Sequence, residues 1–384
     1  MAWLHIQNAR VFTPEDLGVA DALCWGGRIV AVGTDLRPPP GAEVEALNAK
    51  DRLLLPGLID PHIHIMGASG GNGPACRTPD LPISRIASAG VTAVVSPLGT
   101  DSLSRTVPGL LARAAAATAE GISAYAYTGG WRNPVPTLTG DPQADVLFID
   151  RVLGVKVALA EPTAPPFSAH DLTLLAHAAV IGGRLAGKRA VLHAHIGDRA
   201  EGLQPLDDAV RASGLPPDRF VATHVNRNPR LWRQALDFAK AGGSIDLTTQ
   251  MRPDRGFTGA VPPAAAVLEA FNSGVPPGRI TLSSDSGSAH LRPDGSGAYY
   301  LAGPDTILQT LRELVREGVS WGQAASFASR HAADLLGLSH KGRIAEGADA
   351  DLLLLTGDGD VDRVWCRGRL MVADGNPVVK GHFE

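Results

Sequence analysis

The sequence predicts an α/β fold in which a (β/α)8 TIM-type barrel is joined to a small β domain formed from both chain termini. Three observations lead to this prediction. Eight apolar, strand-like runs alternate with helix-like segments through the middle of the chain. Short strands punctuated by turns occur at both ends. Histidine, lysine and aspartate interrupt the central runs at or near their carboxyl ends.

Composition limits the class of protein. Of the 384 residues, 44% are hydrophobic and 19% charged, which is enough to build a large buried core. The net charge of −4, without a basic block, argues against a nucleic-acid partner. The three cysteines, Cys24, Cys76 and Cys366, are far apart in the sequence, which suits a reducing compartment. No signal peptide or bilayer-spanning run is visible. We therefore expect a soluble cytoplasmic protein with no membrane partner.

The two ends of the chain share one sequence pattern, short apolar segments separated by turn residues. Residues 3–12 and 22–33 are apolar segments separated by turns, with Gly26–Gly27 placed for a tight hairpin. Similar segments return in ADADLLLLTG and VDRVWCRGRLMVADG near the far end. Each end is too small to fold alone, so we predict one β domain from residues 1–52 and 342–384, with the barrel from 53 to 341.

The central strands are expected to form a parallel sheet. Near-continuous apolar runs are typical of parallel strands that are covered on both faces. The runs lie at 53–60, 91–97, 122–129, 153–160, 190–197, 219–225, 243–249 and 279–285. Eight strands can close into a barrel. An open doubly wound sheet is the alternative, but no glycine-rich phosphate-binding motif follows the first run, and the barrel is favoured.

Two helices can be placed by their periodicity. In PRLWRQALDFAKAGG, apolar side chains recur with helical spacing and Gly242 suits the end of the helix. In DTILQTLRELVREG, the same spacing runs from Ile307 to Val315 and ends at Gly318. The segment GQAASFASRHAADLLGL follows and leads into the closing strands.

Polar residues gather at the predicted barrel mouth. Taken singly, each has an ordinary explanation, such as a satisfied core histidine, a snorkelling lysine or a helix-capping aspartate. Taken together, they predict a shared metal site, because barrel enzymes carry their chemistry at the carboxyl ends of the strands. The candidates are His62 and His64 after the first run, Lys156 in the fourth, His193 and His195 in the fifth, His224 after the sixth and Asp285 after the eighth.

Lys156 is the unusual member of this set. Apolar residues surround it in GVKVALA, and a buried ammonium tends to lose its proton or find a counter-charge. A neutral amine can add carbon dioxide and become a carbamate, an anionic ligand able to bridge two metals. The alternative is a lysine paired with Glu161, and the residues alone leave both possibilities open.

This pattern resembles the binuclear members of the amidohydrolase superfamily, and the surrounding sequence resembles the isoaspartyl (β-aspartyl) dipeptidase family. The similar stretches include GLIDPHIHIMG, ASAGVTAVVSPLGTDSLSR, FIDRVLGVKVAL, FVATHVNRNPRLWRQALDFAKAGGSIDLT and RITLSSD, and they cover essentially the whole chain. The resemblance implies a distorted barrel with a small β domain, a homo-oligomer, and a cytoplasmic enzyme of the metalloprotease type that acts on a small amide or dipeptide-like substrate.

The resemblance also implies a ligand set for two divalent ions, with zinc expected: His62, His64, carboxylated Lys156, His195, His224 and Asp285. It selects His195 because Gly–Asp follows it as in the family, whereas His193 has no counterpart there. A hydroxide bridging the metals would attack the amide carbonyl. Asp285 would take up the nucleophile's proton and pass it to the leaving amine.

The substrate-reading residues depart from the family. Gly71 stands where the family has a glutamate for the substrate's amino group, Trp131 replaces a tyrosine and Thr163 replaces an arginine. Only Arg227 matches, and its planar fork suits a carboxylate. Thr100 and Ser288 are further candidates, with Ser284 and Ser286 weaker ones. We therefore expect an amide hydrolase whose substrate is an acylated, cyclic or aromatic amide rather than a plain β-aspartyl dipeptide.

Three other functions remain open from the sequence. The chain could be a true isoaspartyl dipeptidase if Arg132 or another loop group compensates for the lost residues. It could be a ring-opening hydrolase of the hydantoinase or dihydroorotase type, since those enzymes use the same ligands. It could also be a metal-binding scaffold with a vestigial site, which retention of Asp285 with every ligand disfavours.

Overall fold

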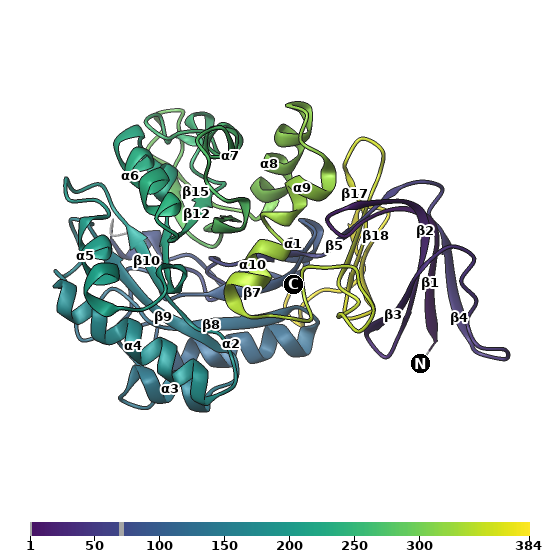
Figure 1. Cartoon of the computed structure of the whole chain (residues 1–384), viewed down its shortest axis with the longest axis horizontal. Coiled ribbons are helices and arrows are strands. Elements are labelled where there is room, and N and C mark those ends of the chain that lie inside the picture. The colour runs from purple at the N-terminus through teal and green to yellow at the C-terminus, as the bar shows by residue number, and fades with distance from the viewer. Residues whose placement is uncertain (1, 69–72) are drawn as a thin grey trace.

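A computed structural model describes residues 2–68 and 73–384. Figure 1 shows two parts side by side: a barrel wrapped by helices, and a twisted sheet built from both ends of the chain. The barrel strands are all parallel and run in chain order: β6 (Leu58–Asp60), β7 (Val91–Ser96), β8 (Ser123–Gly129), β9 (Val152–Leu159), β10 (Val191–Ile196), β11 (Phe220–Thr223), β12 (Ser244–Thr248) and β13 (Ile280–Ser283). The predicted fold class is confirmed.

Ten helices are present in the described residues, most of them on the outside of the barrel (Figure 1). They are α1 (Ile83–Ser88), α2 (Val107–Glu120), α3 (Pro142–Phe148), α4 (Ala169–Leu185), α5 (Gln204–Ser213), α6 (Pro229–Lys240), α7 (Pro263–Asn272), α8 (Asp305–Arg316), α9 (Trp321–Ser326) and α10 (Arg330–Leu336). Short 3-10 turns lie at Pro74–Cys76, Pro217–Arg219, Val225–Arg227, Pro253–Arg255 and Pro277–Arg279. No helix in the described residues is long and apolar enough to cross a membrane.

The two helices predicted from periodicity are present as α6 and α8. The apolar stripe of α6 is buried against the barrel, including Leu231, Trp232 and Leu236. In α8, Ile307, Leu311 and Leu314 are fully buried. The 3.6-residue spacing was sufficient here because each helix buries one face in the hydrophobic core.

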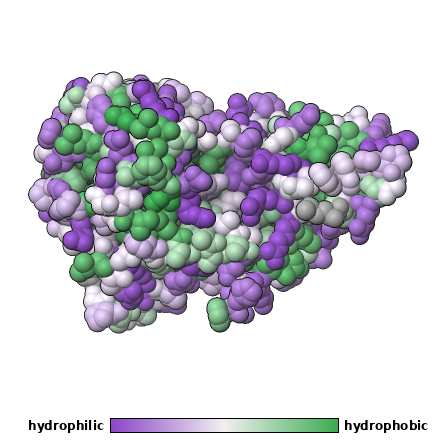
Figure 2. All heavy atoms as spheres, turned by 90° about the horizontal axis from the view of Figure 1, so that it is seen from below, coloured by the Kyte–Doolittle hydropathy of each residue, from purple (hydrophilic) through white to green (hydrophobic). Residues whose placement is uncertain are grey.

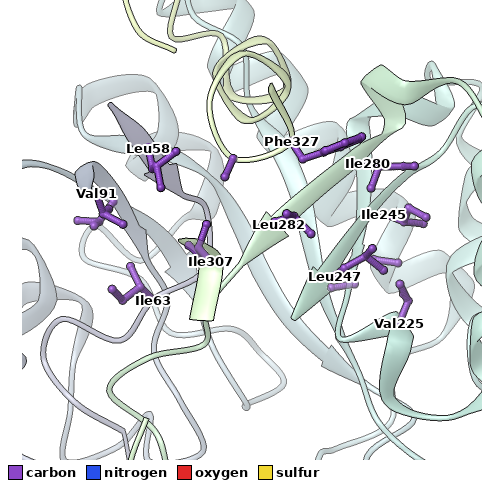
Figure 3. Packing of buried hydrophobic residues seen from close by; sticks show 14 of the residues in the cluster. Leu58, Ile63, Val91, Val225, Ile245, Leu247, Ile280, Leu282, Ile307 and Phe327 are labelled. Atoms are coloured by element: carbon purple, nitrogen blue, oxygen red, sulfur yellow. The ribbon is translucent and has the colours of Figure 1, made fainter. Parts of the chain in front are cut away.

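The segment that follows α8 forms two short helices, α9 and α10, with a break at residues 327–329. The break has a structural cause. The carbonyl of Phe327 accepts a hydrogen bond from the Leu282 amide of β13 at 3.1 Å, and the carbonyl of Ala328 accepts one from the Ile59 amide of β6 at 2.6 Å. Figure 3 shows Leu58, Leu282 and Phe327 in this packed region. The chain therefore inserts between the first and last strands, and the barrel is distorted at that seam.

The terminal sheet contains nine strands: β1 (Trp3–Phe12), β2 (Asp16–Trp25), β3 (Arg28–Gly33), β4 (Val44–Asn48), β5 (Leu53–Pro56), β16 (Leu352–Leu355), β17 (Val361–Cys366), β18 (Arg369–Ala373) and β19 (Asn376–Pro377). A separate hairpin joins β14 (Ala289–Leu291) to β15 (Tyr299–Leu301). The N-terminal strands lie at the end of the molecule farthest from the barrel (Figure 1). The division of the chain into domains at residues 52 and 342 stays a prediction.

The run at 53–60, predicted as one barrel strand, is two strands in two different sheets. β5 pairs with β1 and β16 in the terminal sheet, and only β6 belongs to the barrel. Gly57 lies between them, and a Cβ there would stand 2.4 Å from the side chain of Thr92. Only glycine fits that close approach. Continuous apolar character concealed the break, because both halves are buried.

Candidate metal centre and active site

His62 and His64 lie just beyond the carboxyl end of β6, with ring centroids 5.3 Å apart. Both rings approach Asp285 beyond β13. The Nε2 atom of His62 is 3.6 Å from Asp285 Oδ1, and that of His64 is 3.3 Å from the same oxygen. His224, beyond β11, completes a group with His62 and Asp285 whose possible ligand atoms all lie within 4.8 Å of one another. The structure therefore brings together residues that the sequence separates widely.

The other ring nitrogen of three of these histidines is already engaged. His62 Nδ1 lies 2.8 Å from His193 Nε2, His64 Nδ1 lies 3.2 Å from the carbonyl oxygen of Pro97, and His224 Nδ1 lies 2.6 Å from Thr248 Oγ1. The Pro97 carbonyl can only accept, so it places a proton on His64 Nδ1 and leaves the Nε2 atom for a metal, whereas the contacts of His62 and His224 allow either direction of donation. The pKa of His62 and of His224 is lowered, mainly by burial, so both rings are neutral.

His195 is oriented in the opposite sense. Its Nε2 atom lies 3.3 Å from Glu161 Oε2, so Nδ1 is the atom left for a ligand. The ring of His195 lies edge-on to His224, with centroids 4.5 Å apart. Burial lowers the pKa of His195 well below its usual value. His195 is therefore part of the cluster, whereas His193 lies behind it, against His62.

Lys156 is buried at the centre of β9. Its Nζ atom donates to the carbonyl oxygen of Leu98 at 2.9 Å and lies 5.1 Å from the ring centroid of Trp131. Within the described part of the chain, no carboxylate forms an ion pair with Nζ, and Glu161 contacts His195 and Arg227 instead. The alternative of a Lys156–Glu161 pair is therefore not observed. Burial lowers the pKa of Lys156 to about 7, so much of the amine is unprotonated near neutral pH.

Two buried carboxylates, Asp60 and Asp246, accept hydrogen bonds from residues of the barrel strands next to the cluster. Asp60 accepts hydrogen bonds from the backbone amides of His62 and Ser284, both at 3.2 Å, and also contacts the Ser284 hydroxyl. Asp246 accepts from three hydroxyls, those of Thr223, Thr281 and Ser283. Burial raises the pKa of Asp60 to about 8 and that of Asp246 to about 6. Sequence reasoning missed both, although a carboxylate inside an apolar run was a visible signal.

A cavity of about 370 Å³ opens over the cluster. Of the residues predicted to read the substrate, Thr100, Trp131, Thr163, Arg227 and Ser288 line it. Ser284 and Ser286 are buried beside the cluster and do not line it, and Gly71 lies outside the described residues. The far wall consists of residues that sequence reasoning did not identify, because they come from loops and the β14–β15 hairpin: Met251, Phe257, Ala289 and His290.

Arg227 is not a free cation. Its Nη1 atom lies 3.2 Å from Asp198 Oδ2 and 3.7 Å from Glu161 Oε2. Two carboxylates therefore compete with any substrate carboxylate for the guanidinium. The ring centroids of Trp131 and His195 lie 4.8 Å apart, so an aromatic surface also flanks the cluster.

The histidines and the aspartate lie at or near the carboxyl ends of the barrel strands, and a buried lysine from β9 faces them. This arrangement is typical of barrel enzymes with a metal centre. The pattern of the amidohydrolase family matches residues 155–371. Crystal structures of β-aspartyl dipeptidase from the thermophilic keratin-degrading Fervidobacterium islandicum AW-1 have TM-scores of 0.89, at 30% and 31% identity over 98% of both chains. One of them is a complex with β-Asp-Leu dipeptide. The chain belongs to the amidohydrolase family, as its sequence predicts.

Other relatives are more distant. A D-hydantoinase structure has a TM-score of 0.73 at 19% identity, over 99% of this chain and 97% of that one, and thus shares the fold. Dihydroorotase of Lactiplantibacillus plantarum is 24% identical over 389 residues, which span 91% of this chain and 88% of that protein. The family and these neighbours are hydrolases of amide and other C–N bonds, typically metal-dependent, and this chain is a hydrolase of that class.

Proposed function

We propose that this protein is a binuclear metal-dependent amide hydrolase whose ligands are His62, His64, carboxylated Lys156, His195, His224 and Asp285. The proposal rests above all on the convergence of His62, His224 and Asp285 within 4.8 Å. The donor set fits divalent metal: neutral imidazoles with a ring nitrogen left free, a carboxylate, and a buried amine without a carboxylate partner in the described residues. Imidazole and oxygen ligands favour zinc among the common ions.

When bound, the metals would activate a water molecule near neutral pH and polarise the scissile carbonyl. The residues of the chain then have separate tasks. Asp285 accepts the proton of the attacking water and returns it to the leaving amine, acting as general base and then as general acid. Lys156, as a carbamate, supplies an anionic ligand that the neutral histidines cannot. The Trp131 ring shields the centre from bulk water, which strengthens electrostatic interactions within it.

The substrate is proposed to be an amide other than a plain β-aspartyl dipeptide. Thr163 lacks the positive charge, and Trp131 lacks the O–H donor, that the dipeptidase family has at these positions. The guanidinium of Arg227 is already paired with the carboxylates of Asp198 and Glu161. A lost oxyanion donor typically costs about 3 kcal/mol of barrier. Trp131, Met251 and Phe257 give the cavity an apolar wall that suits an acyl or aromatic group. An N-acyl or cyclic amide fits this lining better than a zwitterion.

One experiment separates the candidates. Purified protein with its metal content measured is assayed on β-Asp-Leu, on a set of N-acyl amino acids and on hydantoin and dihydroorotate. Release of amine from N-acyl substrates, with poor turnover of β-Asp-Leu, is the expected result. Efficient cleavage of β-Asp-Leu would make the protein an isoaspartyl dipeptidase, and ring opening alone would make it a cyclic-amide hydrolase. A fully metallated protein inactive on every amide would indicate a scaffold.

A homo-oligomer is proposed as well, from the resemblance and from an exposed apolar surface on α3 and α4. Figure 2, the view from below, shows hydrophobic side chains gathered in a band at the barrel end of the molecule, on the side where α3 and α4 lie in Figure 1. The exposed large apolar residues of these helices are Phe148, Leu174, Ile181 and Leu185. Light scattering tests this proposal: a mass above 40.0 kDa in wild type, reduced by Ile181→Glu, is expected.

A further inference from the structure

The sequence of β10 carries a second histidine, His193, whose surroundings differ from those of His195. His193 is 1% exposed and lies opposite Lys156 in the β9–β10 ladder. Its ring stacks on Tyr127, with centroids 4.6 Å apart and an interplanar angle of 12°. Its Nε2 atom lies 2.8 Å from His62 Nδ1. It is therefore held rigidly on one side by an aromatic ring and joined on the other side to a proposed ligand.

The direction of the His62–His193 hydrogen bond determines what His62 can bind. If His62 Nδ1–H donates to His193 Nε2, then His62 Nε2 has a free lone pair that points toward the cluster. If the bond runs the other way, the proton of neutral His62 is on Nε2, and that atom cannot bind a metal. A metal ion bound by both His62 Nε2 and Asp285 Oδ1, which lie 3.6 Å apart, requires the first arrangement.

The first arrangement leaves the remaining proton of His193 on Nδ1. Among the described residues, Nδ1 of His193 is buried without a hydrogen-bond partner. An unpaired buried donor is unfavourable for folding. A phenylalanine would keep the stacking on Tyr127 without this unfavourable feature. Packing alone therefore does not account for a histidine at this position, whereas an acceptor aimed at His62 does.

We propose that His193 is a positioning residue that holds His62 in the tautomer able to bind metal. The inference rests on the proposed metal centre, and it goes beyond it because His193 contacts no proposed metal position itself. A ligand histidine elsewhere in this centre uses a backbone carbonyl for the same purpose, as His64 does with Pro97. For His62 the acceptor is a side chain, that of His193, so a single substitution can remove the acceptor.

The test compares two replacements of His193 by metal titration. His193→Phe keeps the ring against Tyr127 and removes the acceptor, whereas His193→Gln places an amide oxygen near the position of the lost Nε2. Metal-free proteins are titrated with Zn²⁺ against a chromophoric chelator, and with Co²⁺ while its visible spectrum is followed. His193→Phe is expected to weaken metal binding about 10- to 100-fold and to alter the Co²⁺ spectrum. His193→Gln is expected to restore both toward wild type.

Thermal unfolding of the metal-free proteins separates positioning from a structural role. The metal-free His193→Phe protein is expected to be about as stable as wild type, because it loses the unpaired Nδ1–H of His193 while the Nδ1–H of His62 loses its acceptor. His177→Phe, which removes a partly buried imidazole on α4, is the control and should leave metal affinity unchanged. Wild-type affinity in His193→Phe, or equal loss in the Phe and Gln variants, would overturn the inference while leaving the metal centre intact. Failure of wild type to bind Zn²⁺ or Co²⁺ would overturn the metal centre itself.

Discussion

The backbone amide of Asp285 donates to the carbonyl oxygen of His62 at 3.0 Å, so the first and last strands of the barrel are joined at the level of the candidate metal centre. A second bond, from the amide of His64 to the carbonyl of Ser286 at 2.7 Å, continues this seam. Asp285 has a left-handed backbone conformation, with φ of 54°. These two backbone hydrogen bonds hold Asp285 in that conformation and direct its carboxylate toward His62 and His64.

Asp285→Asn is expected to lower kcat by about 10²- to 10⁴-fold, the usual contribution of a general acid–base group. Asparagine tolerates the left-handed conformation well, so the backbone seam should survive the change. Activity is measured on whichever amide the wild type hydrolyses, with metal content determined in parallel. An active, metal-loaded Asp285→Asn protein would mean that another group transfers the proton.

Lys156→Met is expected to reduce metal affinity at least about 100-fold, because the apolar stem is kept and the amine that could form a carbamate is lost. The wild-type apoprotein should regain metal faster when bicarbonate is added, whereas Lys156→Met should not respond to it. Equilibrium dialysis followed by elemental analysis measures both quantities. A wild type indifferent to bicarbonate, with full metal content in Lys156→Met, would contradict the carboxylated-lysine ligand.

Thr163→Arg is expected to raise kcat/KM for β-Asp-Leu by about 10-fold or more, the scale of one charge-assisted hydrogen bond to a substrate carboxylate. Thr163 lines the cavity and so the longer side chain can reach the substrate. Thr163→Gln is the matched control, similar in reach but uncharged. Equal gains in the two variants would show that side-chain size, and not charge, limits this substrate.

The metal-free protein is expected to lose stability as the pH falls below about 6.5. Burial lowers the pKa of His193 to about 3. Burial also lowers the pKa of three other histidines well below the usual value: His62, His195 and His224. The unfolded chain therefore takes up more protons on these histidines than the folded one in this range, and the stability that the four neutral histidines contribute is complete above about pH 6.5. Asp60 and Asp246 have raised pKa values and therefore favour the folded state as the pH falls. These two carboxyl groups are outnumbered by the four histidines, so the net effect is a loss of stability.

Urea unfolding of the metal-free protein at about pH 5.5 and pH 7 checks the sign: the midpoint should be higher at pH 7. His193→Phe should have a shallower pH dependence, by up to about 1.4 kcal/mol per pH unit for one titrating group. A midpoint that rises on acidification would show that the buried carboxylates dominate.

Lys341→Met is expected to destabilise the protein by about 3–5 kcal/mol, because it leaves Asp351 buried without its cation and leaves Asp349 with Arg28 alone. The Nζ atom of Lys341 lies 2.8 Å from Asp349 and 2.7 Å from Asp351, where the chain leaves the barrel for β16. Arg28→Met is the control. Arg28 binds Asp349 at 2.8 Å but is half-exposed, so its loss should cost less than about 1 kcal/mol. Chemical denaturation compares the two.

The candidate ligand cluster could be predicted in part from sequence, because parallel barrel strands all end at one rim and a polar residue near a strand end is already placed in space. His224 and Asp285 followed from this rule, whereas Lys156 was conspicuous as a lysine within an apolar strand and His195 was selected over His193 only by the family resemblance. The roles of His193 and Asp60 could not be predicted, since burial inside a strand or at its end does not reveal which neighbour a side chain contacts. Phe257 comes from a loop and His290 from the short β14–β15 hairpin, neither of which carries a clear periodic signal, and their place in the cavity depends on tertiary packing.

The splitting of residues 53–60 between two sheets has a consequence for synthesis of the chain. β5 (Leu53–Pro56) has β16 (Leu352–Leu355) as its antiparallel neighbour, which is synthesised only after the whole barrel sequence. Until then, the segment that leads into β6 and the two histidines after it lacks one of its hydrogen-bonding edges. A nascent chain would therefore complete this end of the barrel last, and a truncation that removes β16 would disturb the candidate metal centre even though β16 supplies none of its residues.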